Sequence, residues 1–212
     1  MEKLKSSITN MALVLTGVAV ITGGILAYIN QVTSGPIALQ KEKALADGIK
    51  TVMGGGELSV AKTDTVKQEI NGKEVVYVIY QTQDKQKKDL GAAVESTTQG
   101  FGGDLKILVG FNPEGNILGY TLLEHAETPG LGAKADKWFQ KGAKGDIIGK
   151  NPAEELVVSK DGGKVDAITA STITSRAFLL AVNNAYKAYK ATPIDGESGA
   201  SKVKKEEVKT AK

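Results

Sequence analysis

A long uncharged segment near the amino terminus limits what this chain can fold into more than any other feature. Residues 6–40 contain no Asp, Glu, Lys, Arg or His, and residues 11–29 within them are almost all apolar. As a helix that rises about 1.5 Å per residue, 11–29 would be about 28 Å long, close to the ~30 Å hydrocarbon core of a bilayer. A core helix of a soluble protein would normally keep a polar face, which this run lacks. The pattern predicts a single transmembrane helix over 11–29.

The basic residues around this segment predict its orientation. Lys3 and Lys5 precede it, and no further positive charge occurs until Lys41. Positively charged flanks stay on the cytoplasmic side, so residues 1–10 are expected in the cytoplasm and the main domain outside it. A cleaved signal peptide is the alternative, but the apolar run exceeds a usual signal core and no small-x-small cleavage site follows it. We therefore expect a retained single-pass helix in a bacterial cytoplasmic (inner) membrane, with an extracytoplasmic or periplasmic domain.

The region after the membrane segment predicts a linker helix and then strands. Residues 33–36, Thr-Ser-Gly-Pro, are typical of a helix start, and three glycines at 54–56 end helices, which predicts a linker helix within 30–56. Runs rich in β-branched and aromatic residues follow, and they predict strands. They are 74–80, 90–96, 105–111, 117–123 and 156–159. Residues 112–116, Asn-Pro-Glu-Gly-Asn, are a hairpin turn signal between two of these runs.

Helical patterns complete the domain. A short helix is expected around Trp138, and a longer one over 175–190. Hairpins with helices at both ends predict an α+β domain over 57–190, with a mainly antiparallel sheet and flanking helices. From 191 to 212, Gly, Ser, Lys and Glu dominate and the apolar pattern ends, which predicts a disordered tail.

The composition argues against several functions. Lys and Arg number 27 and Asp and Glu 24, for a net charge of +3, and aromatic residues make up 5% of the chain. This near balance does not suggest nucleic-acid binding. The chain has no cysteine and one histidine, His125. We therefore expect no iron–sulfur cluster, no disulfide, no metal site, no haem and no catalytic residue.

A run of hydroxyl side chains at 166–176 suggests a phosphate site. Thr169, Ser171, Thr172 and Thr174 lie between an apolar strand end at 165–168 and the last helical pattern. Free backbone N–H groups and the helix dipole at such a junction favour an anion. An ordinary helix cap is the alternative, because Ser and Thr cap helices routinely and a cap needs only one hydroxyl.

A second segment, 123–132, contains a turn that a flat ligand could approach. Thr128, Pro129 and Gly130 form a turn signal, and Gly130 and Gly132 would let the backbone come close to a ligand. An ordinary strand-to-helix turn explains the same residues. These two segments, about 40 residues apart, carry the chemistry that the sequence suggests.

The hydroxyl run resembles the attachment motif of the FMN-binding domain family, Asp-x-x-Ser/Thr-Gly-Ala-Thr. Asp166 matches the acid, Thr169 the first hydroxyl residue and Thr172 the last Thr. The resemblance implies that Thr172 carries FMN through a phosphodiester. It also implies that a separate flavin transferase, which uses FAD, recognises Asp166, Thr169 and Thr172. Ala170 stands where Gly is usual and Ser171 where Ala is usual. Gly readily adopts a positive φ, whereas Ala does not.

The segment 123–132, Leu-Glu-His-Ala-Glu-Thr-Pro-Gly-Leu-Gly, resembles a block that two members of this family share. They are the G subunits of Rnf-type ferredoxin:NAD electron-transport complexes and the C subunits of sodium-translocating NADH:quinone reductases. The resemblance implies a membrane-anchored electron carrier that works as a redox subunit of an ion-translocating oxidoreductase. The Rnf-type subunit is favoured over the quinone-reductase subunit. A flavin-free, membrane-tethered binding or assembly domain remains a third interpretation.

The resemblance also implies a cofactor site and partners. Residues expected around the flavin are Glu127, Thr128, Gly130, Leu131, Gly132, Thr169, Ala170, Ser171, Ile173 and Thr174. Arg176 is expected either beside the phosphate or as a solvated surface residue. The implied partners are the other membrane and redox subunits of the complex, with the flavin transferase acting during maturation.

Overall fold

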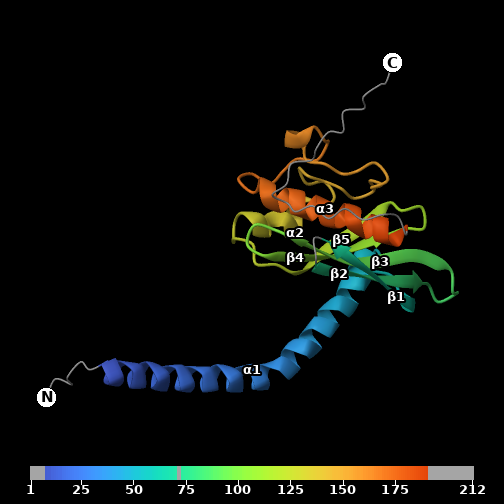
Figure 1. Ribbon diagram of the computed structural model, residues 1–212. Helices are drawn as coiled ribbons and strands as arrows, with labels where there is room; N and C mark the ends of the chain where they lie inside the picture. The colour runs from blue at the N-terminus through green and yellow to red at the C-terminus, as the bar shows by residue number, and fades with distance from the viewer. Residues whose placement is uncertain (1–7, 71–72, 191–212) are drawn as a thin grey trace. The chain divides into compact units, whose positions relative to one another are not determined.

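The computed structural model describes residues 8–70 and 73–190. Its elements are α1 (Ile8–Val52), β1 (Ser59–Ile70), β2 (Lys73–Gln83), β3 (Asp89–Gln99), β4 (Asp104–Phe111), β5 (Ile117–Glu124), the 3-10 helix η1 (Gly132–Lys134), α2 (Ala135–Trp138), the 3-10 helix η2 (Ser159–Asp161) and α3 (Thr172–Tyr189) (Figure 1). Contacts divide the chain into two compact units, 1–44 and 45–212. The predicted tail, 191–212, lies outside the described residues.

A single helix, α1, replaces the two helices that the sequence predicted. It runs over 45 residues with Pro36 inside it, so the expected start of a linker helix at 33–36 is wrong. The hydroxyls there bond backward instead: Thr33 Oγ1 donates to the Ile29 carbonyl at 2.8 Å, and Ser34 Oγ donates to the Gln31 carbonyl at 3.0 Å. Such bonds satisfy the hydroxyls within one continuous helix. A proline inside a helix removes one N–H donor and crowds the carbonyl four residues earlier, a cost that α1 accommodates at Pro36.

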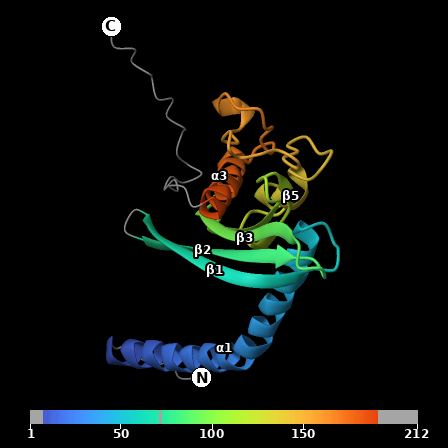
Figure 2. The same cartoon turned by 90° about the vertical axis from the view of Figure 1, so that its right-hand side faces the viewer.

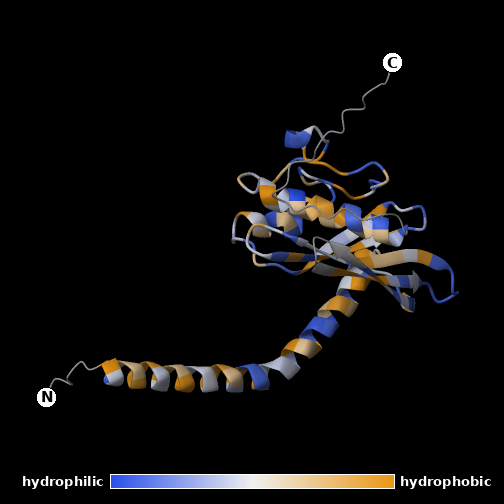
Figure 3. Cartoon of the chain, in the orientation of Figure 1, coloured by the Kyte–Doolittle hydropathy of each residue, from blue (hydrophilic) through white to orange (hydrophobic). Residues whose placement is uncertain are grey.

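The amino-terminal part of α1 matches the predicted membrane segment. Among the described residues, α1 is the one helix that is long and apolar enough to cross a membrane. Figure 3 shows apolar residues recurring along its first half. Its large apolar side chains are exposed around the whole helix. They include Leu13, Leu15, Ile21 and Leu26. A stretch of this kind needs an apolar surrounding, which a bilayer supplies.

The carboxy-terminal end of α1 packs on the sheet. The helix ends at Val52, and Gly54 and Gly55 follow with positive φ angles of 94° and 76°, as the glycine run predicted. Ile49 and Val52 pack against Leu108 of β4 in a small apolar cluster. The Val52 carbonyl approaches Gly110 so closely that a Cβ there would clash.

The sheet has five antiparallel strands in the order β1-β2-β3-β4-β5. The predicted strands at 74–80, 90–96, 105–111 and 117–123 correspond to β2–β5, and the hairpin turn at 112–116 is present. β1 was missed because it alternates between polar and charged residues and lacks an apolar run. Over residues 59–67 its side chains are mostly exposed at the sheet edge, where charges discourage pairing with other chains.

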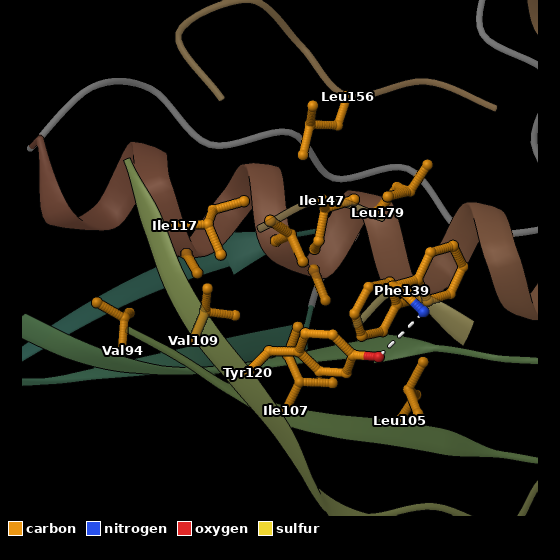
Figure 4. Close-up of a cluster of buried hydrophobic side chains, with 14 of the residues drawn as sticks. Val94, Leu105, Ile107, Val109, Ile117, Tyr120, Phe139, Ile147, Leu156 and Leu179 are labelled. Atoms are coloured by element: carbon orange, nitrogen blue, oxygen red, sulfur yellow. Dashed lines mark hydrogen bonds between the residues drawn. The ribbon is translucent and has the colours of Figure 1, made fainter. Parts of the chain in front are cut away.

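Helix α3 covers the other face of the sheet (Figure 2). The main core lies between them, and Figure 4 shows a part of it. Tyr120 anchors this core from β5: its hydroxyl donates to the Ala135 carbonyl at 2.7 Å and accepts from the Phe139 N–H at 3.2 Å. Phe139 stacks on Phe178 of α3 with the ring centres 4.3 Å apart. The fold is therefore α+β with flanking helices, as predicted.

Two expected strands before α3 are wrong. Residues 156–159 and 165–168 form only one isolated bridge, between Val158 and Val165. At this point the side chain of Asn183 on α3 makes the backbone hydrogen bonds that a neighbouring strand would otherwise make. It accepts from the Leu156 N–H and donates to the Leu156 carbonyl, each at 3.0 Å. Helix α3 is therefore entered from a loop, and it begins at Thr172, three residues earlier than the expected Ser175.

Candidate functional site

The turn before α3 is held by one buried hydroxyl. Ser175 Oγ accepts from the Ile168 N–H at 2.9 Å and donates to the Ser171 carbonyl at 2.9 Å. Between these residues Ala170 adopts a φ of 61°. The left-handed region costs a residue with a Cβ about 1–2 kcal/mol. A positive φ at this position suits Gly, and this chain adopts it with Ala.

The start of α3 has the features of an anion site. Ser171 is its N-cap residue but makes no side-chain capping bond, and no acidic residue lies in the first turn. The first backbone N–H groups of a helix lack acceptors within the helix and carry partial positive charge. Thr172 is the first helical residue and is partly exposed. A phosphate group on its hydroxyl would lie beside these N–H groups.

A groove of about 390 Å³ opens beside this helix start. It is lined by Phe101, Glu127, Thr128, Leu131, Gly132, Ala170, Ser171, Thr172, Ile173 and Thr174. The structure thus brings together most of the residues that the sequence suggested, from two segments far apart in the chain. Gly130 and Thr169 do not line the groove. Phe101, which the sequence analysis missed, comes from the turn between β3 and β4.

The two glycines of the 128–132 turn have different roles. Gly130 has a φ of 77°, and a Cβ built there would meet no atom within 4 Å. Glycine adopts this φ without strain, and the space beside it is open. A Cβ at Gly132 would collide with the Glu127 carboxylate and the Thr174 hydroxyl. Gly132 is what lets the turn pack closely against α3.

Glu127 ties the walls of the groove together. Its side chain is 5% exposed. One carboxylate oxygen accepts from Thr174 Oγ1 at 2.8 Å, and the other accepts from the Phe101 N–H at 2.8 Å. The carboxylate thus joins α3 to the turn between β3 and β4. Its oxygens are used within the protein, so Glu127 forms a wall of the groove rather than a free acid.

Arg176 matches neither of its expected roles. Its guanidinium forms a two-pronged ion pair with Asp161, with distances of 2.6 and 2.7 Å. Hydrogen bonding to Asp161 is the main cause that raises the pKa of Arg176 above its ordinary value. The ion pair is mostly buried, so Arg176 is neither solvated nor directed at the phosphate site.

A lysine that the sequence analysis missed lies at the expected attachment residue. Lys160 Nζ donates to Thr172 Oγ1 at 3.1 Å. Asp166, the acid of the motif, accepts a 3.3 Å hydrogen bond from Ser159 Oγ. Nothing in the spacing of the sequence indicates either contact, because both depend on the position of η2. The contact between Lys160 and Thr172 can therefore be recognised only in the folded structure.

Other features give no competing chemistry. In the described part of the chain, no group of three or more His, Cys, Asp and Glu residues could hold a metal ion. A larger hollow of about 700 Å³ lies over residues of the 150–165 segment. Thr172 does not line that hollow. We therefore assign the candidate site to the smaller groove, which Thr172 does line.

Two family descriptions match the chain. They are an FMN-binding domain over residues 100–187 and an RnfG N-terminal region over residues 1–52. The chain is 31% identical over 191 residues to the G subunit of an ion-translocating oxidoreductase complex of Shewanella baltica, covering 86% of this chain and 89% of the relative. It is 34% identical over 170 residues to the corresponding G subunit of Yersinia pestis, covering 76% of this chain and 80% of the relative.

A third relative has comparable similarity. The chain is 31% identical over 187 residues to a protein of Clostridium ljungdahlii, covering 87% of this chain and 92% of the relative. That protein is the G subunit of a proton-translocating ferredoxin:NAD(+) oxidoreductase complex. Both blocks singled out in the sequence fall within the FMN-binding match.

Proposed function

The chain belongs to the family of G subunits of ion-translocating oxidoreductase complexes, and from this premise we propose that it is the membrane-anchored FMN subunit of an Rnf-type complex. In this role it carries electrons between neighbouring redox subunits of an ion-translocating ferredoxin:NAD oxidoreductase. The match to an FMN-binding domain and the exposed apolar helix support the cofactor and the anchor. The quinone-reductase C subunit is not favoured, because the relatives named above are G subunits.

The residues at the start of α3 fit a phosphate ester of FMN. Thr172 offers a partly exposed hydroxyl at a helix start without acidic residues. Phe101, Leu131 and Ile173 give the adjoining groove apolar surface on which a flat ring could lie. Bound FMN supplies one-electron transfer chemistry. The residues of this chain hold the phosphate, orient the ring and limit its exposure to water.

We infer that the flavin is attached to Thr172 by a transferase that uses FAD. Thr172 Oγ1 would form a bond to the phosphorus of the FMN half, while the bond between that phosphorus and the AMP oxygen breaks. AMP leaves with the electron pair, and the proton of Thr172 passes to solvent or to a base of the transferase. A tether of this kind keeps the flavin at a high local concentration.

The observation that carries this proposal is that residues from two segments, 127–132 and 170–174, line one groove. The two segments match the family's motif blocks and are separated by about 40 residues, yet both line the space beside Thr172. Since a plain helix cap requires only one hydroxyl, it would not explain this convergence.

In-gel fluorescence of the denatured protein tests the attachment. The full-length wild type, purified from its native host, should give a fluorescent band, and intact mass should show one added FMN. Thr172→Ala should give a dark band with the mass of the bare chain, whereas Thr63→Ala, at an exposed threonine of β1 outside the motif, should remain fluorescent. A dark wild-type band would support the flavin-free binding domain instead. Fluorescence retained by Thr172→Ala would assign the attachment to another residue.

A further inference from the structure

Three consecutive residues of η2 each contact the attachment segment. Ser159 Oγ donates to the Asp166 carboxylate, Lys160 Nζ donates to Thr172 Oγ1, and Asp161 pairs with Arg176. We call these residues, Ser159–Asp161, the η2 turn. The contacts reach the acid of the motif, its last Thr and the arginine that follows one helical turn later. This turn is therefore the part of the chain that lies directly against the attachment residue.

The ion pair at the end of the η2 turn fixes the lysine beside it. The Arg176–Asp161 pair is two-pronged, and its two side chains are only 19% and 12% exposed. Such a pair holds its partners in a defined geometry. Because Asp161 directly follows Lys160, the pair holds the backbone that carries the lysine against the first turn of α3.

Lys160 is the basic side chain that bonds to the attachment hydroxyl in the described part of the chain. Arg176 is the basic residue nearest to Thr172 in sequence, and its guanidinium forms an ion pair with Asp161. The positive charge at the attachment hydroxyl therefore comes from Lys160, together with the partial charges of the helix start.

We propose that Lys160 is a positioning residue for flavin attachment: its ammonium group orients Thr172 Oγ1 and compensates the negative charge of the phosphate. This role rests on the proposed attachment at Thr172. Before the reaction, the ammonium group fixes the direction of the hydroxyl and attracts the pyrophosphate of FAD. It also favours the negative charge that builds up on the oxygen as its proton leaves. After the reaction, it faces the diester, which keeps one negative charge.

The test measures how fast a purified flavin transferase, supplied with FAD, attaches FMN to the full-length chain in detergent. Lys160→Met keeps the length and apolar stem of the side chain but removes its charge. It should slow attachment about ten-fold, the size expected for losing one hydrogen bond to a charged group. Lys160→Arg restores the charge and should recover most of the rate. Lys164→Met is the matched control, since Lys164 pairs with exposed Glu154 and does not contact Thr172.

Two further measurements separate a role in charge from a role in folding. Salt screens exposed charges, so the wild-type rate should fall with ionic strength more steeply than the rate of Lys160→Met. The unfolding temperature of unmodified Lys160→Met should equal that of the wild type, because the lysine is exposed. Attachment to Lys160→Met at the wild-type rate and with the same salt dependence would overturn the role. So would a Lys160→Arg rate as low as that of Lys160→Met. If the wild type accepts no FMN, the proposed attachment itself fails, and the role of Lys160 fails with it.

Discussion

Thr174 Oγ1 donates a 2.8 Å hydrogen bond to the Glu127 carboxylate, and so joins α3 to the segment that follows β5. Both side chains are almost completely buried, with 1% and 5% of their surface exposed. The other oxygen of Glu127 accepts from the Phe101 N–H. Three walls of the groove therefore depend on one carboxylate. A site of this kind keeps its shape only while that carboxylate stays bonded on both sides.

The first prediction concerns this buried contact. Thr174→Val keeps the branched shape but removes the donor, which leaves a buried carboxylate oxygen without its partner. The free energy of unfolding should fall by about 1–3 kcal/mol, measured by denaturant unfolding of the full-length protein in detergent. Thr128→Val is the control, because Thr128 lines the same groove but is exposed. Equal stabilities for the two variants would show that the Thr174 contact contributes nothing.

A second prediction follows from the positive φ of Ala170. Glycine adopts this conformation without the steric cost of about 1–2 kcal/mol that alanine bears, although it adds about 0.4–1 kcal/mol of entropy to the unfolded chain. Ala170→Gly should therefore raise the free energy of unfolding by up to about 1.6 kcal/mol and leave Thr172 able to accept FMN. Ala153→Gly, at an exposed position without a positive φ, should instead lower it. A loss of stability in Ala170→Gly would show that the positive φ of Ala170 does not strain the folded chain.

The sequence predicted those parts of the fold that have a local pattern. The strands β2–β5 carry apolar and β-branched runs, and the 112–116 turn carries its own turn residues. β1 lacks such a run because it lies at the sheet edge with exposed side chains. The prediction of two strands before α3 was wrong for a different reason. There Asn183 satisfies the Leu156 backbone from a helix distant in sequence, and no local pattern reports that contact.

The candidate site divides in the same way. The motif residues and the 127–132 turn could be recognised because each is continuous in sequence, and they meet in one groove. Lys160 and Phe101 could not be recognised, because their places depend on Asp161, Arg176 and the carboxylate of Glu127. Gly130 was assigned to the ring because a glycine can permit close approach, and that contact stays a prediction. The structure adds that its positive φ suits a turn with open space beside it.

The third prediction tests which surface meets the flavin ring. Because Val would strain the positive φ of Gly130, a change there would test folding rather than ring contact. Leu131 is the better probe, since it lines the groove and is 41% exposed. Leu131→Ala should leave FMN attached to Thr172 but shift the absorption spectrum or reduction potential of the flavin. Phe101→Ala, in the turn between β3 and β4 that also lines the groove, should likewise shift the spectrum or the reduction potential of the flavin.

Leu118→Ala is the matched control for this measurement. Leu118 is 39% exposed on β5 but does not line the groove. Its loss should leave the spectrum and potential of the attached flavin unchanged. If Leu131→Ala and Phe101→Ala also match the wild type in both properties, the ring lies elsewhere on the domain and the groove serves only the fold.

The last prediction concerns the side of the membrane on which the domain lies. Lys3 and Lys5 precede the apolar segment, so the positive-inside rule predicts that the domain lies outside the cytoplasm. The chain has no cysteine, so a single cysteine introduced at a chosen position reports that position alone. Ala153→Cys, at an exposed position of the domain, should react with a membrane-impermeant maleimide in intact spheroplasts. Ser6→Cys, before the apolar run, should react only after the membrane is broken. The reverse pattern would place the domain in the cytoplasm.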